Sequence, residues 1–377
     1  MFKSVILLLP LLLLEANANF VNFFGVDTLF NVSSMPKPAP FGCVVERSWE
    51  LTTSLVPDQE RAREAYKILA KALPQQNVNL NSLGLIGSLE QLKQSQVDVM
   101  KEIYIKPRVN FMKDKMRWKR NEVPFWIHTS GDVAATITGQ VFYAEHNTKN
   151  RDINGYYVAE NPFKYMKSAE QRAFEASPDF QKAYKIVNSR LKEYFKQSKD
   201  FSVDEVVASY DLCRHIIVTY DAAAKRDRVS WCKMFENDEL EVFEFHEELN
   251  LQNNFWHNAL DLGPMVCGII DSLQWTIAST DKDPNGLIGT TFFTVTQQFM
   301  PFLDAMKLLK RVKATEFKKG KSMDLNRIKR IAGRLSTITI YKYNEGCSKQ
   351  TEVFLNGNPQ MVMYRELVGT LKRNYRC

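Results

Sequence analysis

Two kinds of hydrophobic pattern divide the chain into three parts. Short apolar or alternating runs of strand length occur near both ends, at 43–45, 125–127, 287–295, 335–343 and 351–355. The middle third instead shows helical spacing without a strand signal, at 178–195, 203–225 and from 237 to about 249, with a possible extension to 260. This order predicts an α/β fold with an open mixed or parallel sheet, helices on both faces and an all-helical insert. We expect a discontinuous sheet domain, 19–135 and 265–377, and a helical insert (cap) domain, 140–262.

Capping residues give the expected helix starts. Ser177-Pro178 precedes one helix, Ser202-x-x-Glu205 forms a capping box for the next, and Asn237-Asp238 opens a long acidic helix. Pro57-Asp58 precedes an amphipathic helix over 59–73. Further helices are expected at 83–94, 266–277, 299–312 and 364–374, and Asn356-Gly357 predicts a tight turn. The run 133–142 fits a helix or a strand equally well.

The amino-terminal segment predicts export from the cytoplasm. Lys3, the apolar run 5–14 and Ala16-Asn17-Ala18 have the order of a secretory signal, with cleavage after Ala18. The apolar run is too short to span a membrane, and no longer one follows. The asparagine of Asn31-Val32-Ser33 is the one glycosylation acceptor in the sequence. We therefore predict a secreted protein or one of the secretory-pathway lumen.

All six cysteines follow this signal, so an oxidising compartment predicts up to three disulfides. Six cysteines allow fifteen connectivities. Cys213 and Cys232 lie on neighbouring helical stretches of the insert, and a loop of this size is closed easily. We expect these two residues to pair and leave the others open.

The net charge of +7 is unevenly distributed. The run from Lys101 to Arg120 is rich in lysine and arginine, with Met112, Met116 and Trp118 between the charges. Such a run fits an anionic lipid, glycan or phosphorylated ligand, but a solvated helix face with its apolar side turned inward is the simpler interpretation. The secretory route argues against nucleic acid as a partner.

Arg47 is the first candidate site residue. It follows the β-prone run 43–45 and precedes the helix expected at 59–73, so we expect the strand to end before it. Open α/β sheets place ligands at such strand ends, and a fixed guanidinium there suits an anion. The alternative is a surface arginine beside Glu46.

The sequence contains no glycine-rich phosphate loop of the Walker or Rossmann type, no CxxC and no HExxH. Its five histidines show no metal-ligand spacing. We expect no metal and no cofactor, and we interpret His215 and His246 as packed or solvent-facing side chains within helices and not as ligands.

Several segments, in their order along the chain, resemble the histidine acid phosphatases, and among these the multiple inositol polyphosphate phosphatases. They are the strand with Arg47, Leu83 to Gly87, Ile127-His128-Thr129-Ser130, Asp211-Leu212-Cys213 with Ser230-Trp231-Cys232, Phe293 to Pro301, and Val353-Phe354-Leu355-Asn356. The resemblance covers most of the chain after the signal. It implies a sheet domain with a helical cap and a phosphate-binding site at the strand ends.

The catalytic motifs of that family are substituted here. The family carries Arg-His-Gly-x-Arg-x-Pro, whose histidine attacks phosphorus, and a later His-Ala-Glu or His-Asp motif that supplies the proton donor. With Arg47 as the first arginine, the nucleophile falls on Ser48, and the glycine, second arginine and proline fall on Trp49, Leu51 and Thr53. The later motif falls on Val295, Thr296 and Gln297 with Pro301 behind it, and a further arginine of the family falls on Val133.

These substitutions predict that the scaffold is retained and the reaction lost. An unactivated serine is a weak nucleophile, glutamine cannot act as a general acid, and the missing arginines remove the charge that stabilises a transferring phosphoryl group. We expect a non-catalytic binding or structural protein, with an inositol phosphate, another polyanion or an extracellular protein as partner. The alternative is an active phosphatase or other hydrolase with relocated residues, of which His128 and Glu46 are the candidates. A different two-domain α/β protein is the third possibility.

Overall fold

The computed structural model describes residues 43–55, 59–73, 98, 101–108, 125–146, 153–155, 167–219, 230–258, 261–278, 289–319 and 328–377. The strands are β1 (Val45–Thr53), β2 (Phe125–Thr129), β3 (Ile153–Gly155), β4 (Gly289–Thr294), β5 (Thr337–Tyr343), β6 (Thr351–Leu355) and β7 (Asn358–Pro359). The longer helices are α2 (Gln59–Ala72), α5 (Val133–His146), α6 (Ala169–Glu175), α7 (Pro178–Phe195), α8 (Val203–Thr219), α10 (Asn237–Asn258), α11 (Gly263–Ala278), α12 (Thr296–Ala305) and α14 (Tyr364–Tyr375). Short helical turns are η4 (Lys101–Ile105), η5 (Ser230–Met234), η6 (Ala314–Glu316) and α13 (Ile328–Ile331).

The strands form one mixed sheet in the order β3-β2-β4-β1-β5-β6-β7. The first four strands in this order run parallel, and β5, β6 and β7 each pair antiparallel with their neighbour. β1 lies near the middle, between parallel β4 and antiparallel β5. The predicted α/β class with a mixed sheet is confirmed.

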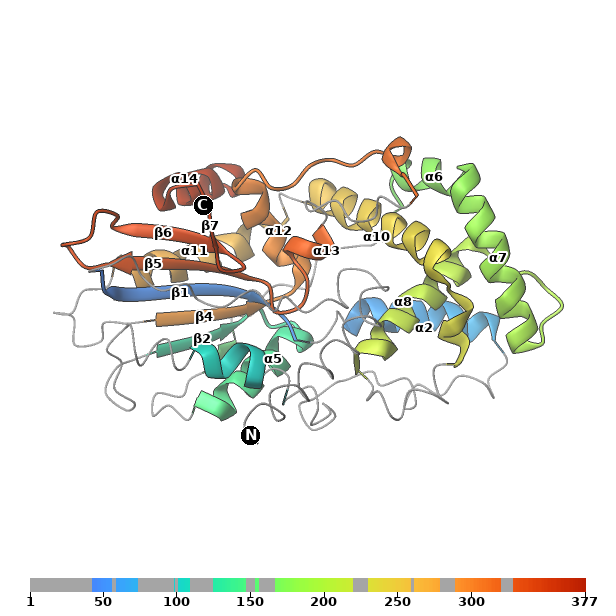
Figure 1. Ribbon diagram of the computed structural model, residues 1–377, viewed down its shortest axis with the longest axis horizontal. Helices are drawn as coiled ribbons and strands as arrows, with labels where there is room; N and C mark the ends of the chain where they lie inside the picture. Colours follow the sequence, from blue (N-terminus) through green and yellow to red (C-terminus); the bar gives the residue numbers. More distant parts are fainter. Residues whose placement is uncertain are drawn as a thin grey trace, which may run out of the picture.

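Helices cover both faces of the sheet (Figure 1). Above it in that view lie α11, α12 and α14, and they enclose a hydrophobic cluster, here the upper core, that includes Trp49, Leu51 and Phe292. Below it, η4 and α5 pack on a second cluster, the lower core, with Leu55, Tyr104 and Phe293. Side chains alternate between the two faces along each strand, which separates Leu51 from Thr52 and Phe292 from Phe293.

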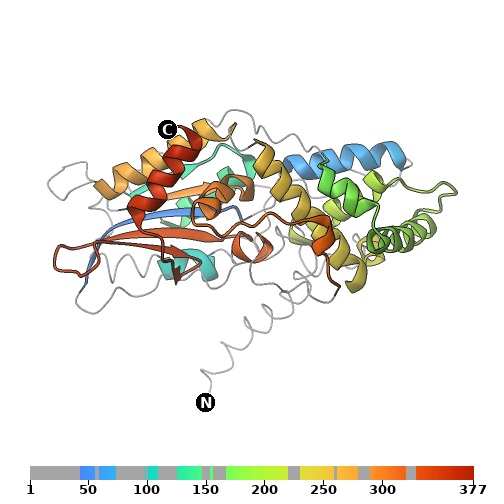
Figure 2. The same ribbon diagram turned by 90° about the horizontal axis from the view of Figure 1, so that it is seen from above.

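A third cluster, the helical core, lies beside the sheet and is made of α2, α6, α7, α8 and α10 (Figure 2). Helix α2 belongs to it because Ala65, Leu69 and Leu73 pack there against α8. The predicted assignment of residues 59–73 to the sheet domain is therefore wrong. Its amphipathic stripe was visible in the sequence, but the partner that covers the stripe was not.

The predicted insert boundaries at 140 and 262 also need correction. Helix α5 continues across position 140 and packs on β2 and β4, and β3 pairs in parallel with β2. Helix α10 contributes Leu249 to the helical core and Phe255 to the upper core. The chain thus passes from the helical core to the upper core within a single helix, α10.

Local signals located several helix starts well, but the helix expected at 299–312 is wrong in its bounds, because α12 spans Thr296–Ala305. Ser177 caps α7, and the Ser202–Glu205 capping box opens α8 with both reciprocal hydrogen bonds, of 2.6 and 3.3 Å. The Asn356-Gly357 turn has positive φ at both residues, as a tight hairpin requires. Residues 133–142 are helical. The expected helix at 83–94, the signal segment and Asn31 lie outside the described residues.

Three disulfides join the six cysteines, and the predicted Cys213–Cys232 pair is confirmed. Cys43–Cys347 links the start of β1 to the loop after β5, and Cys267–Cys377 links α11 to the residue following the cap of α14. Across the described ranges, no helix has both the length and the apolar character of a membrane span.

Two glycines provide a test of how tightly helices pack on the sheet. A Cβ at Gly139 of α5 would lie 2.6 Å from Cγ2 of Thr129, whereas a Cβ at Gly369 of α14 would meet nothing within 4 Å. We expect Gly139→Ala to lower the free energy of unfolding by about 1–3 kcal/mol because α5 must move off β2. The matched change Gly369→Ala should raise it by about 0.5–1 kcal/mol, since alanine restricts the unfolded chain. Urea unfolding of both variants measures this, and equal effects would contradict the close packing of α5.

Candidate active site

The carboxyl ends of β1, β2 and β4 meet at one edge of the sheet, here called the carboxyl edge. The register pairs Thr53 with Thr294 and Thr129 with Phe293, so the three strands end at the same level. This edge faces the helical core, into which the chain passes from β1 to α2 (Figure 1). Ligands of open α/β sheets bind at this position.

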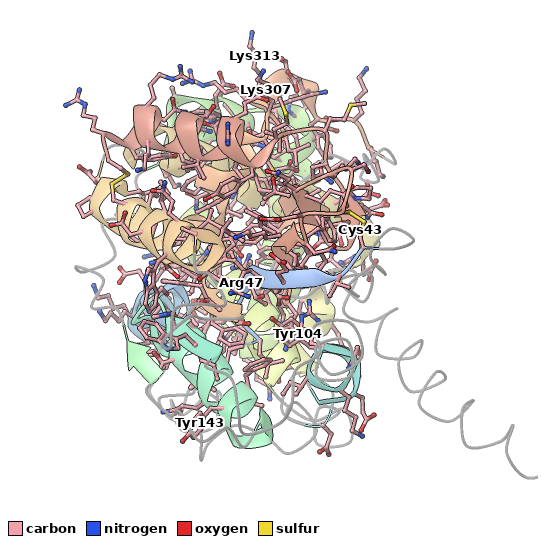
Figure 3. The ribbon with its side chains drawn as sticks, turned by 90° about the vertical axis from the view of Figure 1, so that its left-hand side faces the viewer. Cys43, Arg47, Tyr104, Tyr143, Lys307 and Lys313 are labelled. Atoms are coloured by element: carbon pink, nitrogen blue, oxygen red, sulfur yellow. A yellow bond between two sulfur atoms is a disulfide. The ribbon has the colours of Figure 1, made fainter. Side chains whose placement is uncertain are left out.

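Arg47 does not lie at the carboxyl edge. The predicted strand end before Glu46 is wrong, because β1 continues from Val45 to Thr53. Both β4 and β5 pair with β1 in this polar stretch, for example at Ser48. Arg47 is buried near the opposite end of the sheet, where its guanidinium donates to the carbonyl of Glu46 at 2.8 Å. It lines an open groove there together with Lys342 and the loop after β5 (Figure 3).

The length of β1 also bears on where the first family motif would fall. If the motif lies at the end of the first strand, as a phosphate site at the carboxyl edge requires, it falls four residues later than Arg47 predicts. Leu51, Thr52, Thr53 and Leu55 then occupy the arginine, histidine, glycine and second arginine positions, and Pro57 coincides with the motif proline. Trp49 is instead a core residue, fully buried in the upper core.

The later motif positions do lie at the carboxyl edge. Val295 follows β4 and forms the start of α12, and Thr296 and Gln297 belong to its first turn. Val295 packs in the lower core with Leu55, and the Thr296 hydroxyl donates to the carbonyl of Ala332 at 3.2 Å. Val133, the position expected for a further arginine, begins α5 and packs against the same core.

Several polar groups at this edge are engaged in bonds to their neighbours, whereas the hydroxyl of Ser130, directly after β2, is buried without a hydrogen-bond partner among the described residues. The Leu55 N–H donates to the hydroxyl of Thr138 at 2.8 Å, and the Thr53 hydroxyl donates to the carbonyl of Gly333 at 2.6 Å. The Thr294 hydroxyl donates to Gln298 at 2.6 Å. A phosphate site needs donors directed at the ligand, whereas these donors stabilise the edge itself.

One arginine at this edge was missed by the sequence interpretation. Arg334 is buried just before β5, and its Nε donates to the carbonyl of Leu55. No sequence motif marks Arg334. Its position depends on the turn before β5, in which the next residue, Leu335, has a positive φ of 56°. It holds the end of β1 in place.

A buried polar cluster lies beneath the carboxyl edge on the lower face of the sheet. Glu50 of β1 accepts a bifurcated hydrogen bond from Nε of Arg108, with 2.8 and 2.9 Å to its two oxygens, one hydrogen bond from Tyr104 and one from the Thr52 hydroxyl at 2.8 Å. The guanidinium also lies 3.6 Å from the centre of the Tyr104 ring. All four residues are at most 5% exposed. Figure 3 shows Tyr104 below the strand that carries Arg47.

The ionisation of this cluster follows from its burial. Burial raises the pKa of Tyr104 well above its ordinary value, and the Glu50 carboxylate adds to the rise. Burial by itself would lower the pKa of Arg108, but the Glu50 carboxylate raises it above its ordinary value. Tyr104 therefore stays neutral and donates, and Arg108 stays charged and balances Glu50. Arg108 is part of the basic run from Lys101 to Arg120. Its side chain is buried in the sheet domain and does not face solvent.

Thr52 and Glu50 have the geometry of a nucleophile and its base, but not the surroundings of one. A hydroxyl 2.8 Å from a carboxylate can be activated by it. Here the same carboxylate is already the acceptor for Arg108 and Tyr104, and the Thr52 hydroxyl is fully buried. Satisfied buried networks of this kind make a core rigid.

His128 and Glu46, the candidates for relocated catalysis, are not brought together. His128 and Leu51 both pair with Phe292, so they lie at the same level of the sheet. Glu46 lies five residues before Leu51 on β1, which is about 16 Å along the strand. Its ring is buried and stacks on Phe292 with centroids 5.9 Å apart.

His215 and His246 are both buried in the helical core region, and His246 contacts Glu175 at 2.9 Å. Burial alone would raise the pKa of Glu175, but hydrogen bonds from His246 and Lys167 lower it. Of the two alternatives expected for these histidines, packed or solvent-facing, the structure shows the packed one. Within the described residues, no group of three or more His, Cys, Asp and Glu side chains is arranged to hold a metal.

Solved phosphatase structures share this fold. A phytase from D. castellii superposes with a TM-score of 0.59 at 11% identity, over 91% of this chain and 84% of that chain. A Bifidobacterium longum multiple inositol polyphosphate phosphatase, in complex with inositol hexasulfate, gives 0.52 at 10% identity, over 89% and 91%. A phytase from Citrobacter braakii gives 0.50 at 10% identity, over 89% and 97%. No family model and no curated protein sequence matches the chain. The predicted resemblance is confirmed at the level of the fold.

The Glu50–Arg108 pair generates a stability prediction. Removing one partner leaves the other charge buried and unpaired, so Arg108→Ala should lower the free energy of unfolding by about 3–5 kcal/mol. The double variant Glu50→Gln/Arg108→Met should recover part of this loss because it removes both charges. Lys106→Ala is the control: its pair with Glu102 lies nearby, but both side chains are more than 60% exposed, so the loss should stay below about 1 kcal/mol. Urea unfolding with equal losses in both single variants would contradict the buried network.

Proposed function

We propose that this chain is a secreted, non-catalytic protein with the fold of the histidine acid phosphatases, and that it acts by binding. The observation that carries the proposal is the packing of Leu55 and Val295 together in the lower core. In the register set by the end of β1, these residues occupy the positions of a phosphate-holding arginine and of the late-motif histidine. Apolar side chains at both positions offer neither the charge nor the proton transfer that phosphoryl transfer needs.

The other motif positions support the same proposal. Leu51 and Thr52 replace the first arginine and the nucleophilic histidine, and both are fully buried. Gln297, at the proton donor position, cannot donate a proton as an acid. The bonds within the edge explain how the fold remains stable after these changes, because each substituted position packs or bonds locally.

The signal sequence and the three disulfides support secretion. The phosphatase from Bifidobacterium longum was solved with inositol hexasulfate. A polyanion remains the partner class that the fold favours.

A second candidate function is hydrolysis with Thr52 as nucleophile and Glu50 as base. Its support is the 2.8 Å hydrogen bond between them. Against it stand the full burial of Thr52 and the Arg108 and Tyr104 bonds to the same carboxylate.

Turnover assays separate the two candidates. The protein purified from a secreting host should release phosphate from phytate and from a generic phosphomonoester at the no-enzyme rate, from acid to neutral pH. Thr52→Val removes only the hydroxyl, and Thr276→Val removes an equally buried hydroxyl on α11 as a control. Turnover that survives repurification, persists in Thr276→Val and disappears in Thr52→Val would establish the hydrolase and overturn the binding proposal.

A further inference from the structure

A strap of extended chain, residues 307–319, joins the two halves of the molecule. It leaves α12, crosses the top of the molecule in Figure 1 and reaches α6 through η6. Leu308 and Leu309 pack against the upper core, and Val312, Ala314 and Phe317 pack against the helical core. The apolar residues of the strap therefore face inward along its whole length.

The backbone of the strap is fixed by specific bonds. The N–H of Val312 donates to Gln252 of α10 at 3.0 Å, and the N–H of Ala314 donates to Glu170 of α6 at 2.7 Å. The Phe317 ring lies 5.3 Å from the rings of both Phe174 and Phe245. The strap therefore has a defined conformation on the surface of the protein.

The outward side of the strap is strongly basic. Its exposed cations are Lys307, Lys310, Arg311, Lys313, Lys318 and Lys319, against one exposed carboxylate, Glu316. Lys319 pairs with Asp238 at 2.6 Å, and the other five form no ion pair with the described residues. Figure 3 shows Lys307 and Lys313 at the upper edge of the molecule, far from Arg47. Because the inward residues fix the backbone, the cations are held along one segment of the surface.

We propose that this strap is a docking surface for a linear polyanion, a polysaccharide with repeating sulfate or carboxylate groups. A row of cations along an extended chain matches a row of anions along a polymer, and binding releases the condensed counterions of that polymer. Residues 308–313 alone span about 20 Å at the rise of an extended chain, which covers several sugar units. The proposal does not depend on whether the carboxyl edge has turnover.

A membrane surface fits the strap less well. Peripheral membrane binding combines basic residues with apolar side chains that enter the lipid. The large exposed apolar residues in the described part of the chain are Tyr194, Trp275, Met361 and Met363, and none belongs to the strap. The aromatic ring next to it, Trp256, lies under Arg311 with 5.0 Å between the guanidinium carbon and the ring centre.

The test compares two triple variants of the full secreted chain in binding to immobilised heparin as the probe. The strap variant is Lys310→Glu/Lys313→Glu/Lys318→Glu, and the control is Lys182→Glu/Lys185→Glu/Lys199→Glu, on and after α7. All six lysines are exposed, and both variants change the net charge by the same amount. We expect wild type to bind at an ionic strength of about 0.15 M with an affinity that falls with salt. The strap variant should lose at least about tenfold in affinity and the control less than about threefold.

Each outcome decides the proposal. Equal losses of affinity in the two variants would mean that net charge alone drives binding. An unchanged affinity of the strap variant would place the site elsewhere. Either result would overturn the proposal. Binding to vesicles containing phosphatidylserine without binding to heparin would assign the strap to a membrane and overturn it too. Unsulfated dextran should not bind. Circular dichroism and thermal unfolding of each variant confirm that the substitutions leave the fold intact.

Discussion

The rest of the sheet domain depends on one buried carboxylate, that of Glu50. A carboxylate in the middle of a central strand is very costly unless it is paired and fully hydrogen-bonded. Arg108, Tyr104 and Thr52 provide these bonds, and they bring residues 101–108 against the lower face of the sheet. The rings of Phe142 and Phe293 then pack around Tyr104. These side chains fill the space beneath the carboxyl edge, so the lower core supports that edge.

The helical core contains a comparable arrangement. Arg61 of α2 forms a two-pronged bond to Asp211 of α8, at 2.8 and 3.1 Å, and Arg214 pairs with Glu247 of α10. Two arginines and two carboxylates balance each other among buried side chains. This cluster explains why α2 packs with the helical core and not on the sheet. Arg61, in the first turn of α2, bonds both Asp211 of α8 and Glu247 of α10. The two halves of the molecule are each organised by neutral, buried ion networks.

How much of this the sequence could predict depends on the range of the interaction. Ser177, Ser202 and the Asn356-Gly357 turn act on residues within one turn, so they located their elements closely. The Cys213–Cys232 pair was also local. The run of β1 through Glu46-Arg47-Ser48 was not predictable in this way, because partners in β4 and β5 hold polar residues in a strand. The error at Arg47 follows from that single missed continuation, and so does the difference between the expected and the proposed position of the family motif. The pairings Cys43–Cys347 and Cys267–Cys377 likewise depend on the finished fold.

The same reasoning explains where a function of this chain is expected. Active sites retain charges and donors that the fold itself does not satisfy, and they do so at a cost in stability. At the carboxyl edge the donors of Thr53, Leu55 and Thr294 are used within the edge. On the strap, by contrast, five cations face outward and form no ion pair with the described residues, while the chain beneath them is fixed to two cores. Like charges held side by side repel until an anion covers them, so the strap is where the proposed binding of a polyanion is expected.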